Sequence, residues 1–228
     1  MQPWMLIDTA AVPGGTENLR LLRRGTEFAI NLGTELLMGS RMRGSEEALA
    51  RLGCAALAAR GAGGRVLVGG LGMGFTLRAA LDSLGPAAVV EVAEIVPAIV
   101  DWVRGPLAHL SGHAMADPRV TLRLGDVART IRMARLPYDA ILLDVDNGPV
   151  GLTRDGNDGL YGTAGLRAAW GALAPGGALA VWSAFPDRAF GQRVATVGFT
   201  VEAHTVRAHG GKGATHHIWV ATRPGGPR

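Results

Sequence analysis

The residues best suited to chemistry begin with three glycines at alternating positions, Gly70, Gly72 and Gly74. A short apolar run, 66–68, precedes them, and a helical pattern, 75–81, follows. Glycine suits such a turn because it adopts positive φ and lets a ligand approach the backbone closely. A strand, a glycine turn and a helix also direct backbone N–H groups and a helix N-terminus toward one point. The spacing therefore predicts a nucleotide-type binding site.

The glycine spacing excludes two other nucleotide-binding loops. The dinucleotide fingerprint G-x-G-x-x-G needs a third glycine at position 75, which is Phe75, and the phosphate-binding loop needs a lysine that is absent here. The observed G-x-G-x-G resembles the motif of class I adenosylmethionine-dependent enzymes. The alternative is an ordinary tight turn whose glycines only let the helix pack closely on the sheet.

Acidic residues stand at the ends of the next predicted strands. Glu94 closes the second strand and Asp126 follows the third. Asp144, with Asp146 two residues on, follows the fourth. Ligands of open α/β sheets bind outside the carboxyl ends of the strands, so these side chains are expected at one rim. Because clustered carboxylates repel one another, their gathering favours a ligand over a purely structural role.

These acidic residues meet at one rim only if their strands run in parallel. The sequence alternates strand and helix patterns, as a mostly parallel sheet does. The predicted strands cover 66–68, 88–93, 120–124, 138–143 and 178–182. The predicted helices cover 75–84, 97–110, 127–134 and 163–173. Two last runs, 200–207 and 217–221, predict an antiparallel edge. The predicted fold class is α/β, a doubly wound, mostly parallel sheet.

A small β-hairpin appendage is predicted before this domain. Strand-like runs at 19–24 and 27–32 flank the turn signal Gly25-Thr26, and 35–38 adds a third strand. A helix then begins near Ser45, which can cap it, and two glutamates in its first turn suit the helix dipole. We therefore predict an N-terminal β-strand appendage at 1–44 and an α/β domain at 45–228.

Composition excludes several classes of protein. The net charge of +4 comes from scattered arginines with no basic cluster interleaved with aromatic residues, so we expect no nucleic-acid partner. We expect no membrane association, because no apolar stretch is long enough for a membrane helix and the N-terminus lacks a signal-peptide pattern. The single cysteine, Cys54, indicates a reducing compartment, and we expect the cytoplasm. No metal site is predicted, because no cluster of possible ligands has useful spacing.

Taken in order, the motifs resemble the spermidine synthase-like branch of the class I adenosylmethionine-dependent transferases. The resemblance rests on the glycine motif, Glu94-Ile95, Gly125-Asp126 and the run Tyr138 to Asp144. It implies that Gly70, Gly72 and Gly74 hold the methionine-derived part of the donor, Glu94 the ribose, and Asp126 the adenine amine. Asp144 would face the reacting centre, with Asp146 beside it. The donor would be adenosylmethionine or its decarboxylated form, the acceptor a small molecule, and we expect a homodimer.

Several departures from spermidine synthases bear on which group is transferred. Their glycine loop carries an aspartate that grips the amine of the decarboxylated donor, and Met73 stands at that position. The acidic residue usually two positions past the ribose-binding glutamate is Val96. The helix start that supplies a tyrosine and a His/Gln-Glu pair to the diamine reads Ser45-Glu46-Glu47, which keeps only the acids. The two-aspartate loop is one residue shorter. About half of a diamine site is therefore missing.

Three functions remain open at this point. In the first, methyl transfer from adenosylmethionine, catalysis is mostly positioning, and Asp144 and Asp146 hold or deprotonate the acceptor. In the second, aminopropyl transfer to a small amine, Asp144 is the base. The third is a non-catalytic module that binds an adenosyl ligand. We take methyl transfer as the first hypothesis.

Three further features surround the predicted site. Of the tandem histidines His216-His217, at most one can reach the rim, because successive residues of a strand face opposite sides. Trp182, at the end of the fifth strand, either walls the acceptor pocket or lies in the core. The long polar loop 153–159 is either a lid over the site or a simple connector.

Overall fold

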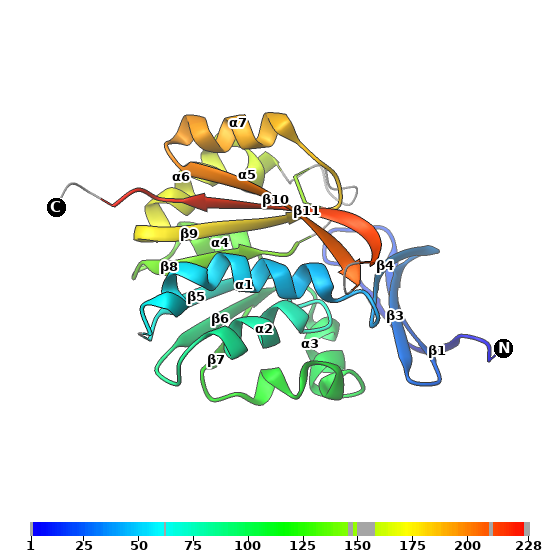
Figure 1. Cartoon of the computed structure of the whole chain (residues 1–228). Coiled ribbons are helices and arrows are strands. Elements are labelled where there is room, and N and C mark those ends of the chain that lie inside the picture. The colour runs from blue at the N-terminus through cyan, green and yellow to red at the C-terminus, as the bar shows by residue number, and fades with distance from the viewer. Residues whose placement is uncertain (1, 62, 146–147, 150–157, 210–211, 226–228) are drawn as a thin grey trace.

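The computed structural model describes residues 2–61, 63–145, 148–149, 158–209 and 212–225. They form an antiparallel sheet of four strands and a larger sheet of seven. Figure 1 shows the smaller sheet at one end of the larger one, on the side of the N-terminus. Asp146 and residues 153–157 of the predicted lid loop lie outside the described residues.

The larger sheet confirms the predicted fold class. Its order is β10-β11-β9-β8-β5-β6-β7, with β5 to β9 paired in parallel and β11 antiparallel to both β9 and β10. The bounds are β5 (Arg65–Gly69), β6 (Val89–Glu94), β7 (Val120–Leu124), β8 (Tyr138–Leu143), β9 (Leu173–Ser183), β10 (Thr200–His209) and β11 (Lys212–Thr222). The sheet is therefore doubly wound and mostly parallel, with the antiparallel edge that the last two runs predicted.

Helices cover both faces of the larger sheet, as Figure 1 shows for α1 and α2 on one side and α6 and α7 on the other. One apolar core contains residues of α1 (Gly44–Ala59), α2 (Phe75–Ser83) and α3 (Pro97–Arg104). The other contains residues of α4 (Val127–Arg132), α5 (Asp158–Tyr161), α6 (Thr163–Ala172) and α7 (Arg188–Val197). Strand residues alternate between the two cores, with Val66 and Val68 in the first and Leu67 in the second. No helix in the described ranges is long and apolar enough to cross a membrane.

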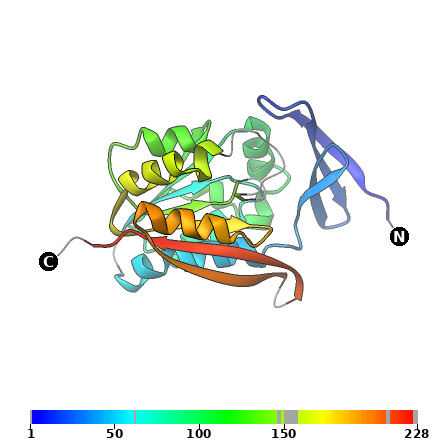
Figure 2. The ribbon, with the colours of Figure 1, turned by 90° about the horizontal axis from the view of Figure 1, so that it is seen from above.

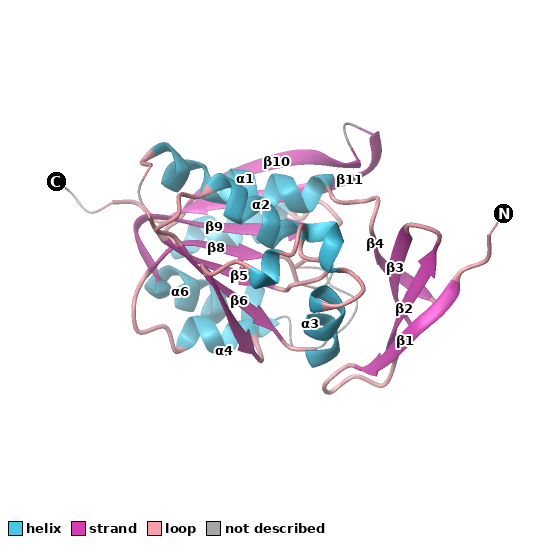
Figure 3. Cartoon of the chain, turned by 90° about the horizontal axis from the view of Figure 1, so that it is seen from below, coloured by secondary structure: helices cyan, strands magenta, loops and turns pink. Residues whose placement is uncertain are grey.

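The smaller sheet shares the first of these cores. It is a meander of β1 (Met5–Ala11), β2 (Asn18–Arg24), β3 (Glu27–Leu32) and β4 (Glu35–Gly39). Leu21 and Ile30 are fully buried in the core that also holds α1 to α3. Trp102 of α3 donates its Nε1–H to Asp8 of β1 at 2.7 Å, and Figures 2 and 3 show this sheet standing beside the end of the larger domain. The predicted division after residue 44 falls at the start of α1 and stays a prediction.

Several local predictions were wrong, each for a physical reason. The strand β1 was missed because nearly all of its residues are exposed, so it has no alternation of buried and exposed positions. Ser45 does not cap α1, because Arg43 occupies the cap position without a side-chain bond and Ser45 is buried with other partners. The helix expected over 97–110 ends at Arg104, where Gly105 leaves the helical backbone, and a short 3-10 helix (Ala108–Ser111) follows.

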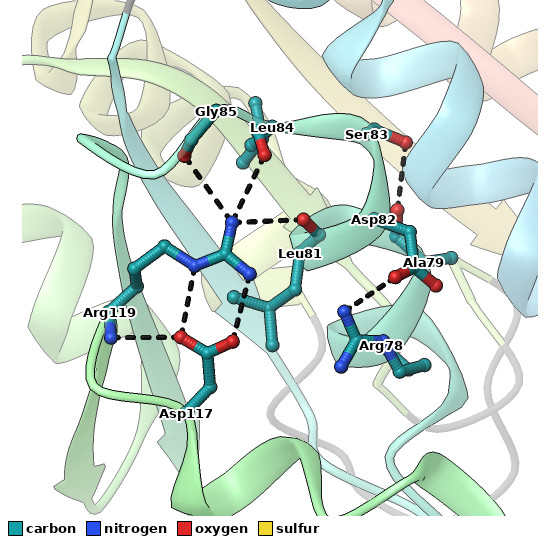
Figure 4. A network of polar contacts seen from close by, with 9 residues as sticks. All are labelled: Arg78, Ala79, Leu81, Asp82, Ser83, Leu84, Gly85, Asp117 and Arg119. Atoms are coloured by element: carbon teal, nitrogen blue, oxygen red, sulfur yellow. Dashed lines mark hydrogen bonds and ion pairs between the residues drawn. The ribbon is translucent and has the colours of Figure 1, made fainter.

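The end of α2 is fixed by Arg119, the residue before β7. Its guanidinium donates to the carbonyl oxygens of Leu81 and Leu84 at 3.0 Å and pairs with Asp117 at 2.8 Å, as Figure 4 shows. The last carbonyls of a helix have no partner inside the helix, so the guanidinium satisfies groups that would otherwise need water.

Candidate active site

A cavity of about 950 Å³ lies over the carboxyl ends of the parallel strands. The glycine turn, the segments that follow β6, β7 and β8, and residues of the smaller sheet all line it. It brings together five of the predicted site residues, namely Gly70, Gly72, Glu94, Asp126 and Asp144. Gly74 is not among the lining residues, and Asp146 lies outside the described part of the chain. The convergence at one rim was the geometric expectation, and the roles of these residues remain predictions.

The three glycines of the turn have different neighbours. All three have positive φ, which any residue with a Cβ adopts at a cost. A Cβ on Gly70 would overlap the carbonyl oxygen of Asp144, and a Cβ on Gly74 would lie 2.9 Å from the Cβ of Ser111. A Cβ on Gly72 would meet only the flexible end of Met38, at 3.4 Å. Gly70 and Gly74 are therefore required by packing within the protein, and Gly72 is the glycine that keeps space open in the cavity.

Glu94 joins two loops at the rim. It is the last residue of β6 and is buried. Its carboxylate accepts the N–H of Leu71 in the glycine turn at 2.9 Å and the N–H of Val96, before α3, at 2.8 Å. A carboxylate oxygen can accept more than one hydrogen bond, so these contacts are compatible with the predicted ribose contact. Glu94 thus has a structural function that its place in the sequence did not indicate.

Asp126 has a structural function as well. It is the N-cap of α4, and its Oδ1 accepts the N–H of Ala128 at 2.7 Å. The preceding Gly125 donates its N–H to the carbonyl oxygen of Glu94 at 2.8 Å, which ties the ends of β6 and β7 together. The residue lines the cavity beside the start of α4, where the adenine amine was predicted to bind.

Asp144 follows β8 directly, and α2 holds its side chain. Thr76, in the first turn of α2, donates its hydroxyl proton to Oδ2 of Asp144 at 2.6 Å. This bond favours the charged carboxylate, but burial is the larger effect and raises the pKa of Asp144 to about 6. A carboxyl group with such a pKa can take and release a proton near neutral pH.

Glu46 is a second cavity carboxylate, which the sequence analysis did not place among the site residues. It lies in the first turn of α1, and burial together with the charge of Asp144 raises its pKa to about 7. Its neighbour Glu47 instead forms ion pairs with Arg43 at 3.3 Å and Arg51 at 3.7 Å on the helix surface. Both acids were interpreted as favourable to the helix dipole, and only the packing of α1 decides which one enters the cavity. The raised pKa values leave the two cavity carboxylates partly protonated near neutral pH.

One of the tandem histidines reaches the cavity, which agrees with the limit of one that the strand geometry predicts. His216 of β11 lines it, and its ring packs against Trp182 of β9 with 4.7 Å between centroids. Nδ1 of His216 lies 2.9 Å from the hydroxyl of Ser45, which lies 2.7 Å from Oε2 of Glu46. Burial lowers the pKa of His216, and neighbouring His217 adds to this effect. His217 faces the other side of the sheet, near Trp219.

Trp182 lines the same cavity and also packs against the first apolar core, so it takes part in both; its role in an acceptor pocket stays a prediction. Among the described residues, no group of three or more His, Cys, Asp or Glu side chains is arranged to hold a metal ion. The polar residues that line the cavity include the four acids described above, His216, Thr16, Glu17 and Arg132.

Comparison with known proteins gives three informative similarities, although no family model matches the chain. The chain is 35% identical over 116 residues to putrescine N-methyltransferase 3 of Nicotiana tabacum, an alignment that covers 50% of this chain. It is 31% identical over 162 residues to the polyamine aminopropyltransferase of Mycobacterium tuberculosis, covering 69% of this chain. Spermidine synthase from Thermotoga maritima superposes with a TM-score of 0.74 at 17% identity, over 96% of this chain and 72% of that one.

The two sequence relatives are aligned over only part of their own length. Each alignment covers only 28% of the relative, so this chain matches less than a third of those proteins. The structural similarity establishes the fold, a class I methyltransferase-like Rossmann sandwich with an N-terminal antiparallel sheet. In sequence and fold together, the chain resembles the spermidine synthase-like branch of the adenosylmethionine-dependent transferases.

Proposed function

We propose that this chain binds adenosylmethionine in the cavity and transfers its methyl group to a small amine. The observation that supports the proposal is that one cavity contains two sets of acidic side chains, one suited to the donor and one to the acceptor. Glu94 and Asp126 suit the ribose and adenine of the donor, as the family resemblance implies. Glu46 and Asp144 form an anionic pair, and a buried ammonium group needs such a partner when it leaves water.

The glycine turn supports adenosylmethionine over its decarboxylated form. Met73 occupies the position where spermidine synthases carry the aspartate that grips the donor amine, and its side chain is buried. An ammonium group held only by that apolar side chain would lack a partner. The carboxylate of adenosylmethionine, in contrast, suits the backbone N–H groups of a strand–glycine turn–helix unit.

The transfer requires alignment and a place for one proton. The acceptor ammonium first gives a proton to the carboxylate pair, which leaves a neutral amine with a free electron pair. The amine nitrogen then forms a bond to the methyl carbon while the carbon–sulfur bond breaks and its electrons stay on sulfur. The products are a methylated ammonium and the thioether adenosylhomocysteine. Because the donor is a sulfonium and the leaving group is a neutral thioether, positioning and proton removal are the main tasks of the protein.

Aminopropyl transfer is the second candidate. The aminopropyltransferase relative aligns with 69% of this chain, against 50% for the methyltransferase relative. The same carboxylate pair would then bind and deprotonate the attacking amine, and the decarboxylated donor would have to bind without an acidic partner at Met73. A non-catalytic module that binds an adenosyl ligand is the third candidate.

Calorimetry with adenosylmethionine and with decarboxylated adenosylmethionine separates the first two candidates. We expect the protein to prefer adenosylmethionine and, with a panel of monoamines and diamines, to yield a product heavier by one methyl group in mass spectrometry. A preference for the decarboxylated donor, with an aminopropyl product, would replace the first candidate by the second. Binding without turnover on amines, thiols and phenols would support the binding module.

A homodimer in the cytoplasm is part of the same proposal. The edge strand β1 exposes the apolar side chains of Met5, Leu6 and Ile7, which supports a self-contact there. The single cysteine supports a reducing compartment. Sedimentation equilibrium measures the first point, because it reports one chain mass or two.

A further inference from the structure

Three side chains form a hydrogen-bonded row from the cavity to β11, namely Glu46, Ser45 and His216. Oε2 of Glu46 lies 2.7 Å from Oγ of Ser45, and the same Oγ lies 2.9 Å from Nδ1 of His216. Ser45 is completely buried, so its hydroxyl has no access to water. His216 is separated from Ser45 by 171 residues of sequence, and only the packing of α1 beside β11 brings the two together.

The hydrogen bonds that join Glu46, Ser45 and His216 can run in either of two directions, depending on whether Glu46 carries a proton. When Glu46 is ionised, Ser45 donates to the carboxylate and must accept from Nδ1–H of His216. When Glu46 carries a proton, it can donate to Ser45, which then donates to the bare Nδ1 of a ring protonated at Nε2. Each direction gives the buried Ser45 hydroxyl a donor and an acceptor, so these three side chains fit both protonation states of Glu46.

We infer that Glu46, Ser45 and His216 form a proton-transfer chain that removes the proton of the acceptor ammonium group from the reaction centre. The inference rests on the proposed function, because it assigns a path to the proton that amine alkylation releases. The ammonium proton moves to Glu46. Exchange with solvent first converts His216 from the Nδ1–H to the Nε2–H tautomer, with one proton lost and one gained, which is the tautomer that a protonated Glu46 requires. The Glu46 proton then passes to Ser45 while the Ser45 proton passes to the bare Nδ1 of His216. The imidazolium formed in this way releases its Nε2 proton to water, and Glu46 is again a carboxylate.

The charged groups around this proton-transfer chain favour transfer from Glu46 to His216. Burial raises the pKa of Glu46 most strongly. The charges of Asp144, after β8, and of Glu47, on α1, raise it further. His217, on β11, adds to the burial that lowers the pKa of His216. Glu46 therefore accepts a proton readily at neutral pH, and the imidazolium of His216 gives its proton up readily. Asp144 has a different partner, the hydroxyl of Thr76, which favours its charged form and leaves it to hold the ammonium.

The first experiment observes the hydrogen-bond direction without any turnover. In protein labelled with ¹⁵N-histidine, long-range proton–nitrogen spectra distinguish an Nδ1–H ring from an Nε2–H ring. We expect His216 to change from Nε2–H at about pH 6 to Nδ1–H at about pH 8, as Glu46 loses its proton. Ser45→Ala should abolish this change, and His217→Asn, on the other face of the strand, should retain it. A single tautomer of His216 across this range in the unaltered protein would overturn the inference.

The second experiment measures transfer. His216→Asn keeps an N–H donor near the Ser45 hydroxyl but cannot take up and pass on a proton. We expect kcat to fall roughly 10²-fold at neutral pH, with donor affinity unchanged, and the rate to recover toward high pH, where the amine arrives deprotonated. His216→Gly should regain rate when imidazole is added to the buffer, and His217→Asn should transfer at the normal rate. An unchanged kcat in His216→Asn would overturn the inference.

The outcomes for the two proposals are distinguishable. If the unaltered protein binds the donor but transfers no group to any amine, the proposed function fails and the inference fails with it. If the unaltered protein transfers a group but His216 keeps one tautomer and tolerates substitution, only the proton-transfer chain is refuted.

Discussion

Replacement of Glu46 by glutamine tests the electrostatic description of the cavity most directly. Burial and the charge of Asp144 raise the pKa of Glu46 from 4.5 to about 7 in the folded protein. The folded state therefore binds this proton more tightly than the unfolded chain does. Its contribution to stability is fully present below about pH 4.5 and is lost as the pH rises to about 7.

The magnitude follows from the same change in pKa. A difference of one in pKa corresponds to about 1.4 kcal/mol, so a rise from 4.5 to about 7 corresponds to roughly 3 kcal/mol. Glu46 is only partly buried and its proton is coupled to that of Asp144, so solvent screening reduces the expected effect to about 1–2 kcal/mol. Asp144 adds a smaller contribution of the same sign, because its pKa is raised to about 6.

Urea denaturation at several values between pH 4.5 and pH 7.5 measures this effect. We expect the free energy of unfolding of the unaltered protein to fall with rising pH across this window. Glu46→Gln should lose most of that slope and be the more stable protein at pH 7.5, since glutamine needs no proton to be neutral. Glu47→Gln is the matched control, because Glu47 pairs with Arg43 and Arg51 at the helix surface. An unchanged slope in Glu46→Gln would refute the buried-pair description, whatever its effect on turnover.

Four further outcomes follow from the same contacts. Asp144→Asn should lower turnover by about 10²-fold with little change in calorimetric donor affinity. The control Asp101→Asn, at an exposed position, should change neither. Proportional losses of binding and turnover in Asp144→Asn would make Asp144 a donor ligand instead. Glu94→Gln should weaken donor binding by about 1–3 kcal/mol, and an unchanged calorimetric affinity would place the ribose elsewhere. Gly72→Val should abolish donor binding while circular dichroism still reports the fold, since the added side chain enters the cavity at positive φ; retained binding would remove the turn from the site. Arg119→Leu should lower the free energy of unfolding by about 1–3 kcal/mol in urea denaturation, because it leaves the α2 carbonyls without their partner. Donor affinity should stay intact, since Arg119 does not line the cavity.

The order of strands and helices was readable because its signals are local. Apolar runs bounded by turn residues predict buried parallel strands, and helical periodicity between them predicts the covering layers. In an open α/β sheet the carboxyl ends of the strands necessarily meet at one rim. The residues that follow those strands, Glu94, Asp126 and Asp144, were therefore predicted to lie together, and all three line one cavity.

The same local signals could not reveal what each of these residues contacts. Glu94 accepts backbone N–H groups from two loops, and Asp126 caps a helix, because both loops fold back on the strand end. Gly70 has no room for a side chain because of the carbonyl oxygen of Asp144, a residue far along the chain. The strand β1 gave no signal, because a strand held mainly by backbone pairing at an edge has no buried face to impose a pattern.

By itself, the sequence determined the fold class, the carboxyl-end location of the site and the three acidic strand ends, since each depends on spacing along a short segment. Only the tertiary structure decided which of two adjacent glutamates enters the cavity and which of two adjacent histidines meets it. Glu46 and His216 join through Ser45 across 171 residues, and that contact depends on how α1 packs beside β11. Desolvation then raises the pKa of one side chain and lowers that of the other, and desolvation depends on the surrounding atoms rather than on neighbours in the sequence.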